Sequence, residues 1–581
     1  MRMRILFLTH SFNSLTQRLY VELAERGHDI SVEFDINDQT TIEAVQLFQP
    51  ELILAPYLRR AIPAVIWQQY LCLVVHPGIK GDRGPSALDW AILNDVPEWG
   101  VTMLQANGEM DAGPVWASVN FPMRQARKSS LYRHEVTEAT VTAVLQAVAR
   151  FGQGGYASEP VDDRQSGTGG NWHPLMNQAD RCINWSMDDT RAVLRKIHSA
   201  DGSPGVADSF FGATYHLYDA REEDTLRGVP GEIIARRHDA ICRATRDGAV
   251  WIGHLKKIIP GEKSFKLPAT LALQDRLHDV PDVPLPLDAS QVSKTYRDIW
   301  YEEKNRVGYL HFDFYNGAMS TEQCQRLRAA YLQACQRPTR VIVLMGGSDF
   351  WSNGLHLNCI EAADSPAAES WRNINAMDDL AQAIITTDSH LTIAALQGNA
   401  AAGGVFLALA ADYIFAREAV VLNPHYKNMG NLYGSEYWTY LLPRRIGTER
   451  GREVMENRLP LGAGAAKRAG LINDCFGKSV DNFIAVVETT AENLARDPSF
   501  GQQLEAKRRR RAQDESNKPL AAYRLEELEH MRMNFYGFDP SYHVARYNFV
   551  FRIARSWTPL HLARHRRLTN KMNDVVTDVA G

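Results

Sequence analysis

The sequence is poor in cysteine and has no pair of cysteines spaced for metal binding. Seven cysteines occur among 581 residues, and none forms a C-x-x-C pair. An odd number of thiols without such spacing argues against a zinc knuckle and against a disulfide framework. We therefore expect reduced thiols, a cytoplasmic location and no bound metal.

Long hydrophobic runs and a strong excess of one charge are also missing. No apolar stretch reaches the roughly 18 residues that a membrane helix needs. The net charge of −4 offers no argument for nucleic-acid binding, so neither a membrane nor a nucleic acid is an expected partner. With 45% hydrophobic and 23% charged residues, the composition is typical of globular protein. The length predicts about three to four domains.

The first part of the chain alternates between strand and helix patterns. Ile5-Leu-Phe-Leu8 and Ile30-Ser-Val-Glu-Phe34 are short apolar runs, whereas residues 15–26 and 41–48 have helical spacing. This alternation predicts an α/β fold with a doubly wound sheet, in which ligands bind at the carboxyl ends of the strands.

His76 and Asp111 are the candidate catalytic residues of this first domain. His76 follows the apolar run Leu71–Val75 and opens His-Pro-Gly-Ile-Lys-Gly-Asp-Arg-Gly84, while Asp111 stands in Met-Asp111-Ala-Gly113-Pro. These two frames resemble the folate-dependent formyltransferases. The resemblance implies formyl-tetrahydrofolate as formyl donor and His76 and Asp111 as promoters of the transfer, with Asp111 orienting a protonated His76.

One position departs from the formyltransferase pattern. Those enzymes carry an Asn two residues before the His, whereas this chain has Val74, which offers no side-chain hydrogen bond. Either another donor replaces it or the acceptor is not the usual amine, and a thiol acceptor would need less help because it is more nucleophilic. The resemblance further suggests cofactor contacts from a set of four residues: Gln17, Gly84, Gly113 and Arg133.

We predict four domains from these patterns. Residues 1–155 form the formyltransferase-like domain, and short strands in residues 156–280 resemble the small OB-like β-barrel that follows such domains. A Pro-rich linker leads to a crotonase-like domain over residues 291–485, and residues 486–581 form a helical extension. Arg552 and Arg555 lie in an aromatic- and Arg-rich part of that extension and are further candidate ligand contacts.

Two glycine turns mark the crotonase-like domain. The strand Val341-Ile-Val-Leu-Met leads to Gly354-Leu355, and Leu396-Gln-Gly-Asn-Ala-Ala-Ala leads to Gly403-Gly404. Together they resemble the crotonase (enoyl-CoA hydratase/isomerase) family, which implies coenzyme A as a cofactor. By that resemblance the amides of Leu355 and Gly403 would bind a thioester oxygen, and Gly354 and Gly404 would let the ligand approach.

The departures from the crotonase pattern concern the catalytic carboxylates. Where hydratases place two water-activating carboxylates, this chain has Phe406 and Tyr426, and a different carboxylate, Glu436, occurs in Gly-Ser-Glu436-Tyr. The expected site polarises a carbonyl but does not add water. Tyr426 and Glu436 are the candidate proton carriers, and the sequence does not decide which is the base and which the acid.

A formyltransferase-like part and a water-deprived acyl-CoA part on one chain resemble the hydrogenase-maturation proteins of the HypX/HoxX family. The resemblance implies formyl transfer from formyl-tetrahydrofolate to CoA, then decarbonylation of formyl-CoA to carbon monoxide for a nickel–iron hydrogenase. Expected partners are small-molecule substrates and either hydrogenase maturation proteins or the hydrogenase large subunit. Two alternatives remain: a fused amine formyltransferase and ordinary crotonase, or a non-catalytic scaffold that binds folate and CoA.

Overall fold

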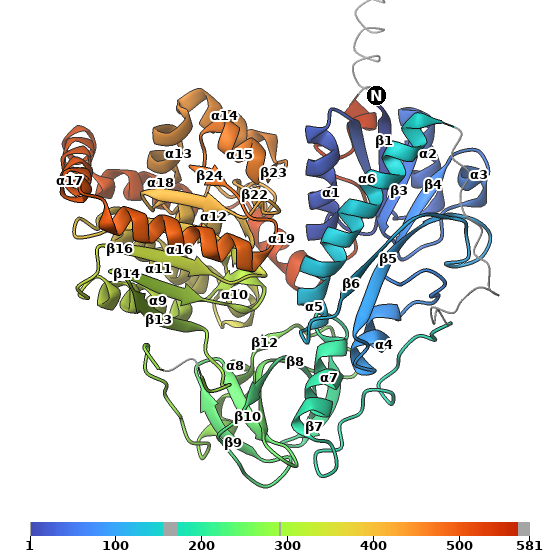
Figure 1. Cartoon of the computed structure of the whole chain (residues 1–581), viewed down its shortest axis with the longest axis horizontal. Coiled ribbons are helices and arrows are strands. Elements are labelled where there is room, and N and C mark those ends of the chain that lie inside the picture. The colour runs from blue at the N-terminus through green and yellow to red at the C-terminus, as the bar shows by residue number, and fades with distance from the viewer. Residues whose placement is uncertain (1, 155–171, 290–291, 568–581) are drawn as a thin grey trace, which may run out of the picture. The chain divides into compact units, whose positions relative to one another are not determined.

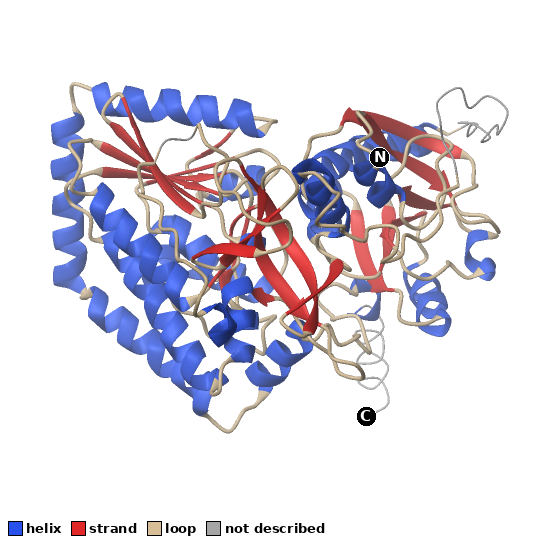
Figure 2. Ribbon diagram, turned by 90° about the horizontal axis from the view of Figure 1, so that it is seen from below, coloured by secondary structure: helices blue, strands red, loops and turns tan. Residues whose placement is uncertain are grey.

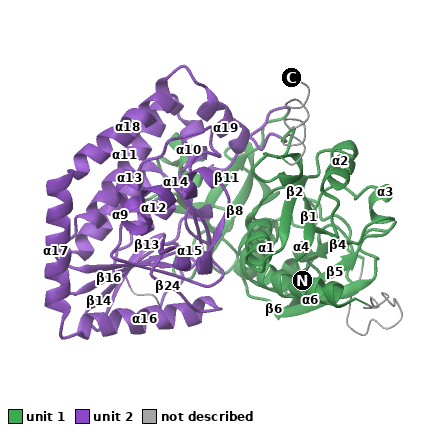
Figure 3. Cartoon of the chain, turned by 90° about the horizontal axis from the view of Figure 1, so that it is seen from above, with its two compact units in different colours: residues 1–260, 268–281, 554–581 green, residues 261–267, 282–553 purple. Residues whose placement is uncertain are grey.

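The computed structural model describes residues 2–154, 172–289 and 292–567. The chain folds into two compact units, one formed by residues 1–260, 268–281 and 554–581, the other by residues 261–267 and 282–553 (Figure 3). The predicted domain boundaries near residues 155 and 291 lie outside the described residues. In the described part of the chain, every helix is too short or too polar to cross a bilayer.

The first unit begins with a six-stranded sheet in the order β2-β1-β3-β4-β5-β6. The first four strands of that order are parallel, whereas β5 runs antiparallel to both of its neighbours, β4 and β6. The sheet is therefore doubly wound only over its first four strands. α1 and α6 pack side by side on it (Figure 1). The strands are β1 (Arg4–Thr9), β2 (Asp29–Phe34), β3 (Leu52–Tyr57), β4 (Cys72–His76), β5 (Glu98–Gln105) and β6 (Val115–Pro122). The helices are α1 (Ser14–Glu25), α2 (Asp38–Phe48), α3 (Ala64–Trp67), α4 (Ala87–Leu93), α5 (Lys128–Leu131) and α6 (Thr137–Gln153).

The same unit contains the expected OB-like barrel. Its strands are antiparallel in the order β7-β8-β11-β10-β9, and Val193 and Ile197 of α7 (Thr190–Ala200) pack into its apolar core. The strands are β7 (Val206–Phe210), β8 (Ala213–Glu223), β9 (Ile233–Arg237), β10 (Ala240–Ala244), β11 (Ala249–Lys257) and β12 (Leu267–Pro268), followed by α8 (Ala269–Leu273).

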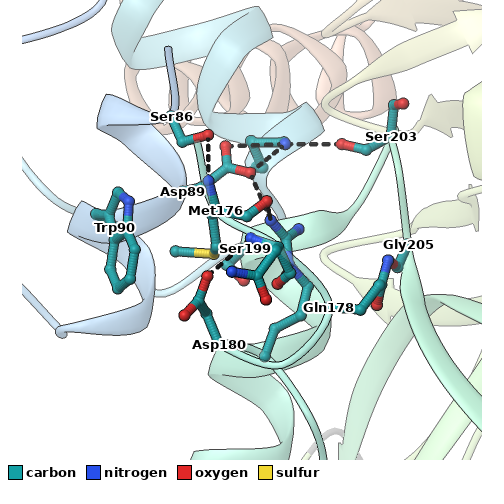
Figure 4. A network of polar contacts seen from close by, with 12 residues as sticks. Ser86, Asp89, Trp90, Met176, Gln178, Asp180, Ser199, Ser203 and Gly205 are labelled. Carbon is teal, nitrogen blue, oxygen red and sulfur yellow. Dashed lines mark hydrogen bonds and ion pairs between the residues drawn. The ribbon is translucent and has the colours of Figure 1, made fainter. Parts of the chain in front are cut away.

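A polar network joins the barrel region to the first sheet (Figure 4). Asp89 of α4 is nearly buried, and its two carboxylate oxygens accept hydrogen bonds from Lys128 Nζ at 2.9 and 3.0 Å. The same ammonium group donates to the carbonyl of Ser203 at 2.8 Å, and Arg181 lies 3.4 Å from Asp89. Because these charges are buried and mutually paired, they hold the two regions in one unit.

The second unit contains two larger sheets and one two-stranded sheet, formed by β15 and β18, among its described residues. Of the two larger sheets, one has the order β13-β14-β16-β19-β21-β24 and the other β17-β20-β22-β23, and helices surround both (Figure 2). The longer strands are β13 (Ile299–Lys304), β14 (Val307–Phe312), β16 (Val341–Gly346), β19 (Leu391–Leu396) and β21 (Tyr413–Ala416). The short ones are β15 (Ala318–Met319), β17 (Phe350–Ser352), β18 (Gly354–Leu355), β20 (Asn399–Ala401), β22 (Val421–Asn423), β23 (Leu461–Gly462) and β24 (Asp474–Cys475). β14, β16, β19 and β21 pair in parallel, each after a connection that includes a helix, which positions their following turns along one edge.

The helices of this unit supply most of its core. α11 and α12 contribute Leu380, Ile384 and Phe406 to the largest apolar cluster. The helices are α9 (Thr321–Ala334), α10 (Leu357–Ala362), α11 (Pro366–Ile385), α12 (Gly403–Leu409), α13 (Trp438–Ile446), α14 (Thr448–Asn457), α15 (Ala463–Ala469), α16 (Val480–Arg496), α17 (Phe500–Asn517), α18 (Leu520–Tyr536) and α19 (Ser541–Val550).

The last described segment differs from a plain helical extension. After α19, residues 554–567 belong to the first unit and run beside β2. The backbone of Val32 donates to the carbonyl of Leu562 at 3.1 Å, and that of Phe34 donates to Oγ1 of Thr558 at 2.8 Å. Buried His565 lies between Ser31 and Glu33, with Nδ1 2.7 Å from Ser31 Oγ and Nε2 2.9 Å from Glu33 Oε2. These contacts cover what would otherwise be the open edge of the sheet.

Candidate functional site

His76 lies at the end of β4, buried between two carboxylates. Its Nε2 is 2.8 Å from Oδ2 of Asp82, and its Nδ1 is 3.5 Å from Oδ2 of Asp111. His76 is 4% exposed and Asp82 2%. The fold therefore brings together His76 and Asp111, which are 35 residues apart in the sequence, at the carboxyl end of a strand.

Asp82 is the residue of this site that sequence reasoning missed. It stands six residues after His76, and its Oδ1 faces Nε2 of His173 at 3.5 Å. Asp82 belongs to the same His76–Gly84 motif that identified His76, and this position could have suggested a role for it. Nε2 of His76 is within hydrogen-bond distance of Asp82, whereas Nδ1 and Asp111 are 3.5 Å apart. The site therefore places two carboxyl groups beside one imidazole and leaves Nδ1 without a short hydrogen bond to either of them.

Val74 occupies the place where formyltransferases have Asn. It precedes His76 by two residues in β4, so both side chains lie on the same face of the strand. Val74 packs against the apolar cluster that contains Ile53 and Cys72. The surface next to His76 is therefore apolar at this position.

Two glycines predicted to contact the cofactor have a structural reason to be glycine. A Cβ at Gly84 would lie 2.0 Å from the carbonyl oxygen of His173, and one at Gly113 would lie 1.7 Å from that of Gln105. The amide of Gly84 also donates to Oδ2 of Asp111 at 3.1 Å. Both glycines thus support the geometry around Asp111, and their contact with a cofactor stays a prediction.

The remaining candidate contacts lie on several different elements. The Gln17 amide group donates to the carbonyl of Phe12 at 2.9 Å, and half-buried Arg133 lies in the π-helical turn Tyr132–Val136. Arg552 is exposed and belongs to the second unit, whereas the Arg555 guanidinium of the first unit lies 5.4 Å from the ring centroid of Phe34. Ligand contacts by these four residues stay predictions.

In the second unit, the two predicted glycine turns approach each other. Gly354 has φ of +78° at the start of β18, and α12 begins at Gly403. A Cβ on Gly354 would lie 3.3 Å from the amide nitrogen of Gly403. Because the first amides of a helix have no partner within it, Gly403 offers an N–H to a ligand beside Leu355.

The Glu436 carboxyl group lies directly against Gly403. A Cβ on Gly403 would lie 2.2 Å from Glu436 Oε1. Tyr426 Oη donates to Glu436 Oε2 at 2.5 Å and lies 2.9 Å from the carbonyl oxygen of Ser435. Glu436 is 1% exposed, and its Oε1 has no hydrogen-bond partner among the described residues. The predicted pair is thus in direct contact, with one carboxyl oxygen left for a ligand.

An apolar ring forms one wall of this site. Phe406 of α12 is fully buried and stacks on Tyr426, with ring centroids 5.4 Å apart and an interplanar angle of 17°. The two positions where hydratases carry carboxylates are therefore adjacent and filled by aromatic rings. Neither position therefore carries a carboxylate, and the prediction that the site does not add water stays a prediction.

Two further buried carboxylates, Asp378 of α11 and Glu527 of α18, were not predicted. Asp378 accepts from the backbone amide of Glu436 at 2.8 Å, and Glu527 accepts from that of Tyr437 at 2.9 Å. Burial, together with the charge of Asp378, raises the pKa of Glu436 to about 8. Burial also raises the pKa values of Asp378 and Glu527. Burial therefore favours the protonated form of each carboxyl group in this cluster, and the three groups titrate together.

The neighbouring glycines of α12 predict different responses to alanine. In Gly404→Ala the new Cβ would lie 2.1 Å from the backbone oxygen of Ser352, which cannot easily move. We expect a loss of about 1–3 kcal/mol in unfolding free energy, measured by denaturant titration. In Gly403→Ala the clash is with the end of the Glu436 side chain, which can shift, so the loss should be smaller. Equal losses would contradict this difference between the two glycines.

Known proteins resemble the chain in both parts. Residues 175–267 match the formyl transferase C-terminal domain, and residues 302–531 match enoyl-CoA hydratase/isomerase. Methionyl-tRNA formyltransferase from Citrifermentans bemidjiense is 25% identical over 39% of this chain and 70% of its own. A crystal structure of HypX from Aquifex aeolicus in complex with tetrahydrofolic acid has a TM-score of 0.94 and 50% identity over 97% of this chain and 99% of that one.

The fold and the two sites define a protein in which a formyltransferase-type part, including its barrel, is fused to an enoyl-CoA hydratase/isomerase-type part. Hydrogenase maturation factor HoxX from Bradyrhizobium diazoefficiens is 53% identical over 567 residues, which cover 97% of each chain. The chain belongs to this HoxX/HypX family of hydrogenase maturation factors. The predicted α/β fold class and the predicted family are confirmed.

Proposed function

We propose that this chain makes carbon monoxide in two steps. Formyl is transferred from formyl-tetrahydrofolate to the thiol of CoA, and formyl-CoA is then decarbonylated to carbon monoxide and CoA. The observation that carries the proposal is the buried Glu436 carboxyl group, whose Oε1 adjoins Gly403 and has no hydrogen-bond partner among the described residues, in a site where aromatic rings replace the hydratase carboxylates. Such a group can move a proton where water activation is not provided for.

The first step is assigned to the His76 site. Formyl-tetrahydrofolate supplies an activated formyl group, and the tetrahydrofolate bound to the Aquifex relative supports a folate site here. His76, held between Asp82 and Asp111, donates a hydrogen bond or a proton to the formyl oxygen. The apolar Val74 beside it suits a thiol acceptor, because a thiol needs no amide hydrogen bond for activation.

The second step is assigned to the amides of Leu355 and Gly403 and to the Tyr426–Glu436 pair. The two amides hold the thioester oxygen. The C–S bond breaks with its electron pair passing to sulfur, and the C–H electron pair becomes the lone pair of carbon monoxide. One proton leaves carbon and one reaches sulfur. Glu436, hydrogen-bonded to Tyr426, can therefore carry both proton transfers and end the reaction with the same number of protons as at the start.

Besides proton transfer, the second step requires exclusion of water, because hydrolysis of formyl-CoA to formate competes with decarbonylation. The stacked rings of Phe406 and Tyr426 fill the two places from which a hydratase activates water. Both side chains are buried, and neither ring carries a carboxylate that could act as a base for water. The product should therefore be carbon monoxide.

The proposal is tested with the full chain, formyl-tetrahydrofolate and CoA. We expect carbon monoxide in the headspace, dependent on both compounds, and also from supplied formyl-CoA without folate. Formyl transfer to an amine together with hydration of an enoyl-CoA would instead support two independent fused enzymes. Binding of CoA, detected by mass spectrometry of the purified protein, without turnover of either substrate would support a non-catalytic scaffold.

The family extends the proposal to partners. Carbon monoxide made here would become a ligand of the iron in a nickel–iron hydrogenase, so the receiving partner would be the hydrogenase large subunit or another maturation protein. The seven cysteines form no disulfide in the described structure, which supports a cytoplasmic location. Co-purification of the tagged chain with hydrogenase precursors tests this part of the proposal.

A further inference from the structure

The loop that carries Glu436 has a backbone conformation that needs support. Glu436 and Tyr437 have φ of +59° and +60°, and neither is a glycine. Left-handed conformations are unfavourable for residues with a Cβ, and two in succession persist only where the surroundings enforce them. Contacts to this loop from outside therefore decide where the Glu436 carboxyl group lies.

Asp378 of α11 supplies the first of these contacts. Its Oδ1 accepts from the amide of Glu436 at 2.8 Å, and both of its carboxylate oxygens lie 2.9 Å from Oγ of Ser435. Asp378 is fully buried. Its carboxylate therefore fixes the backbone immediately before and at Glu436.

Glu527 of α18 supplies the second contact, just after Glu436. Its Oε2 accepts from the amide of Tyr437 at 2.9 Å, and its Oε1 accepts from the amide of Thr439 at 2.8 Å and from its hydroxyl at 2.5 Å. Tyr437 precedes the first residue of α13, and its own side chain does not cap that helix. Buried Glu527 thus serves as the cap of α13 from another helix.

The donors are shared unequally among the three carboxyl groups. Asp378 and Glu527 each accept from backbone amides, an arrangement that favours their ionised form. Glu436 accepts from Tyr426 Oη, with a further contribution from the Ser435 amide, and its Oε1 has no partner within hydrogen-bond distance among the described residues. The other titratable or charged groups near Glu436 are Cys324 of α9, Asp379 of α11, Arg524 of α18 and Tyr437. Arg524 is the cation of this set, and its Nε lies 3.7 Å from Asp378 Oδ2.

We propose that Asp378 and Glu527 are positioning residues that hold the Glu436 loop in its left-handed conformation and keep Glu436 as the neutral carboxylic acid of the cluster. This inference rests on the proposed decarbonylation site and assigns the order of proton transfer there. Neutral Glu436 gives its proton to the leaving sulfur, and the resulting carboxylate takes the formyl proton as carbon monoxide forms. One proton passes from carbon to sulfur in each cycle, so the acid form is regenerated.

Asp378→Asn tests the inference because it removes the charge, and with it the ion pair with Arg524, while allowing the same contacts with Ser435 and Glu436. The Asn carbonyl can accept from the Glu436 amide and the Ser435 hydroxyl, and its NH₂ group can donate to Ser435 Oγ, since a hydroxyl both donates and accepts. Without the negative charge of Asp378, the pKa of Glu436 falls. The neutral form is then lost at lower pH, so the alkaline limb of kcat for supplied formyl-CoA should move down by about one pH unit or more.

Asp379→Asn is the matched control. Asp379 is the next residue of α11 and pairs with Arg524 at 2.7 Å, but its side chain is 45% exposed. The same change of charge there should move the alkaline limb by only about 0.3 pH unit or less, because solvent screens an exposed carboxylate. An equal displacement in both variants, or none in Asp378→Asn, would overturn the inference.

A second measurement keeps this test separate from the proposed function. Infrared difference spectra between neutral and alkaline pH should show the carbonyl stretch of a neutral carboxylic acid in the wild type. The part of that band contributed by Glu436 should be missing from Glu436→Gln, and in Asp378→Asn this part should disappear at lower pH than in the wild type. A wild type that shows the Glu436 part of the band but makes no carbon monoxide would refute the function and keep the inference. A wild type that makes carbon monoxide while the band is undiminished in Glu436→Gln would refute the inference alone.

Discussion

Glu436→Gln is expected to lower carbon monoxide release from supplied formyl-CoA by about 10²- to 10⁴-fold, the usual effect of losing a positioned proton carrier. Glutamine has nearly the same shape, and its amide can still contact Tyr426, so the pocket should remain packed. The loop should also remain in place, because Asp378 and Glu527 bind its backbone and not the Glu436 side chain. An amide neither gives nor takes a proton under these conditions, so the loss should appear in kcat with KM nearly unchanged.

The matched control for this prediction is Glu529→Gln on α18. Glu529 is exposed and makes none of the loop contacts described above. Carbon monoxide is measured in the headspace, formate in solution, and the unfolding temperature of each variant is recorded. Wild-type carbon monoxide output from folded Glu436→Gln would mean that Glu436 is not the proton carrier, and Tyr426→Phe would then become the decisive variant.

His76→Ala is expected to abolish carbon monoxide made from formyl-tetrahydrofolate and CoA while leaving the decomposition of supplied formyl-CoA intact. The loss should be at least about 10²- to 10⁴-fold, because the variant lacks the only imidazole that is placed between Asp82 and Asp111 in the described structure. The substitution also leaves the carboxylate of Asp82 buried beside a cavity, so some loss of stability should accompany it.

Stability and catalysis are separated by comparing the two reactions in the same preparation. His278→Ala provides the matched control, since the His278 side chain is 74% exposed and its contacts are with the nearby Asp279 side chain and Asp275 carbonyl. A folded His76→Ala protein that loses both reactions would contradict the proposed division of labour between the two sites. Full folate-dependent output from that variant would show that His76 does not promote formyl transfer.

The candidate residues that could be read from the sequence are those next to a recognisable turn. His76 follows a strand, and Gly403 follows another, so each could be assigned to the carboxyl edge of a sheet. Glu436 and Tyr426 were found because they depart from the pattern of catalytic residues in the crotonase family. Asp82 stands six residues after His76, in the loop that follows β4. A loop this short can bring its carboxylate back to the His76 ring, so Asp82 could have been predicted.

Asp378 and Glu527 could not have been found in this way. The contacts with Glu436 and Tyr437 join residues 58 and 90 positions apart. In the sequence each carboxylate is one of several in a helix, next to Asp379 or Glu526, and spacing alone does not tell which one turns inward. Here Asp378 and Glu527 are buried, whereas the Asp379 side chain and Glu526 are exposed.

By itself, the sequence determined the α/β class, because strand and helix periods are local properties of a chain. The barrel, the crotonase-like part and the family followed from the resemblance of short local motifs to known families. Only the tertiary structure decided that residues 554–567 return to the edge of β2 and that three carboxyl groups converge behind Gly403. Such convergence depends on how distant elements pack. The protonation of a buried carboxyl group, in turn, depends on the burial and the neighbouring charges that this packing creates.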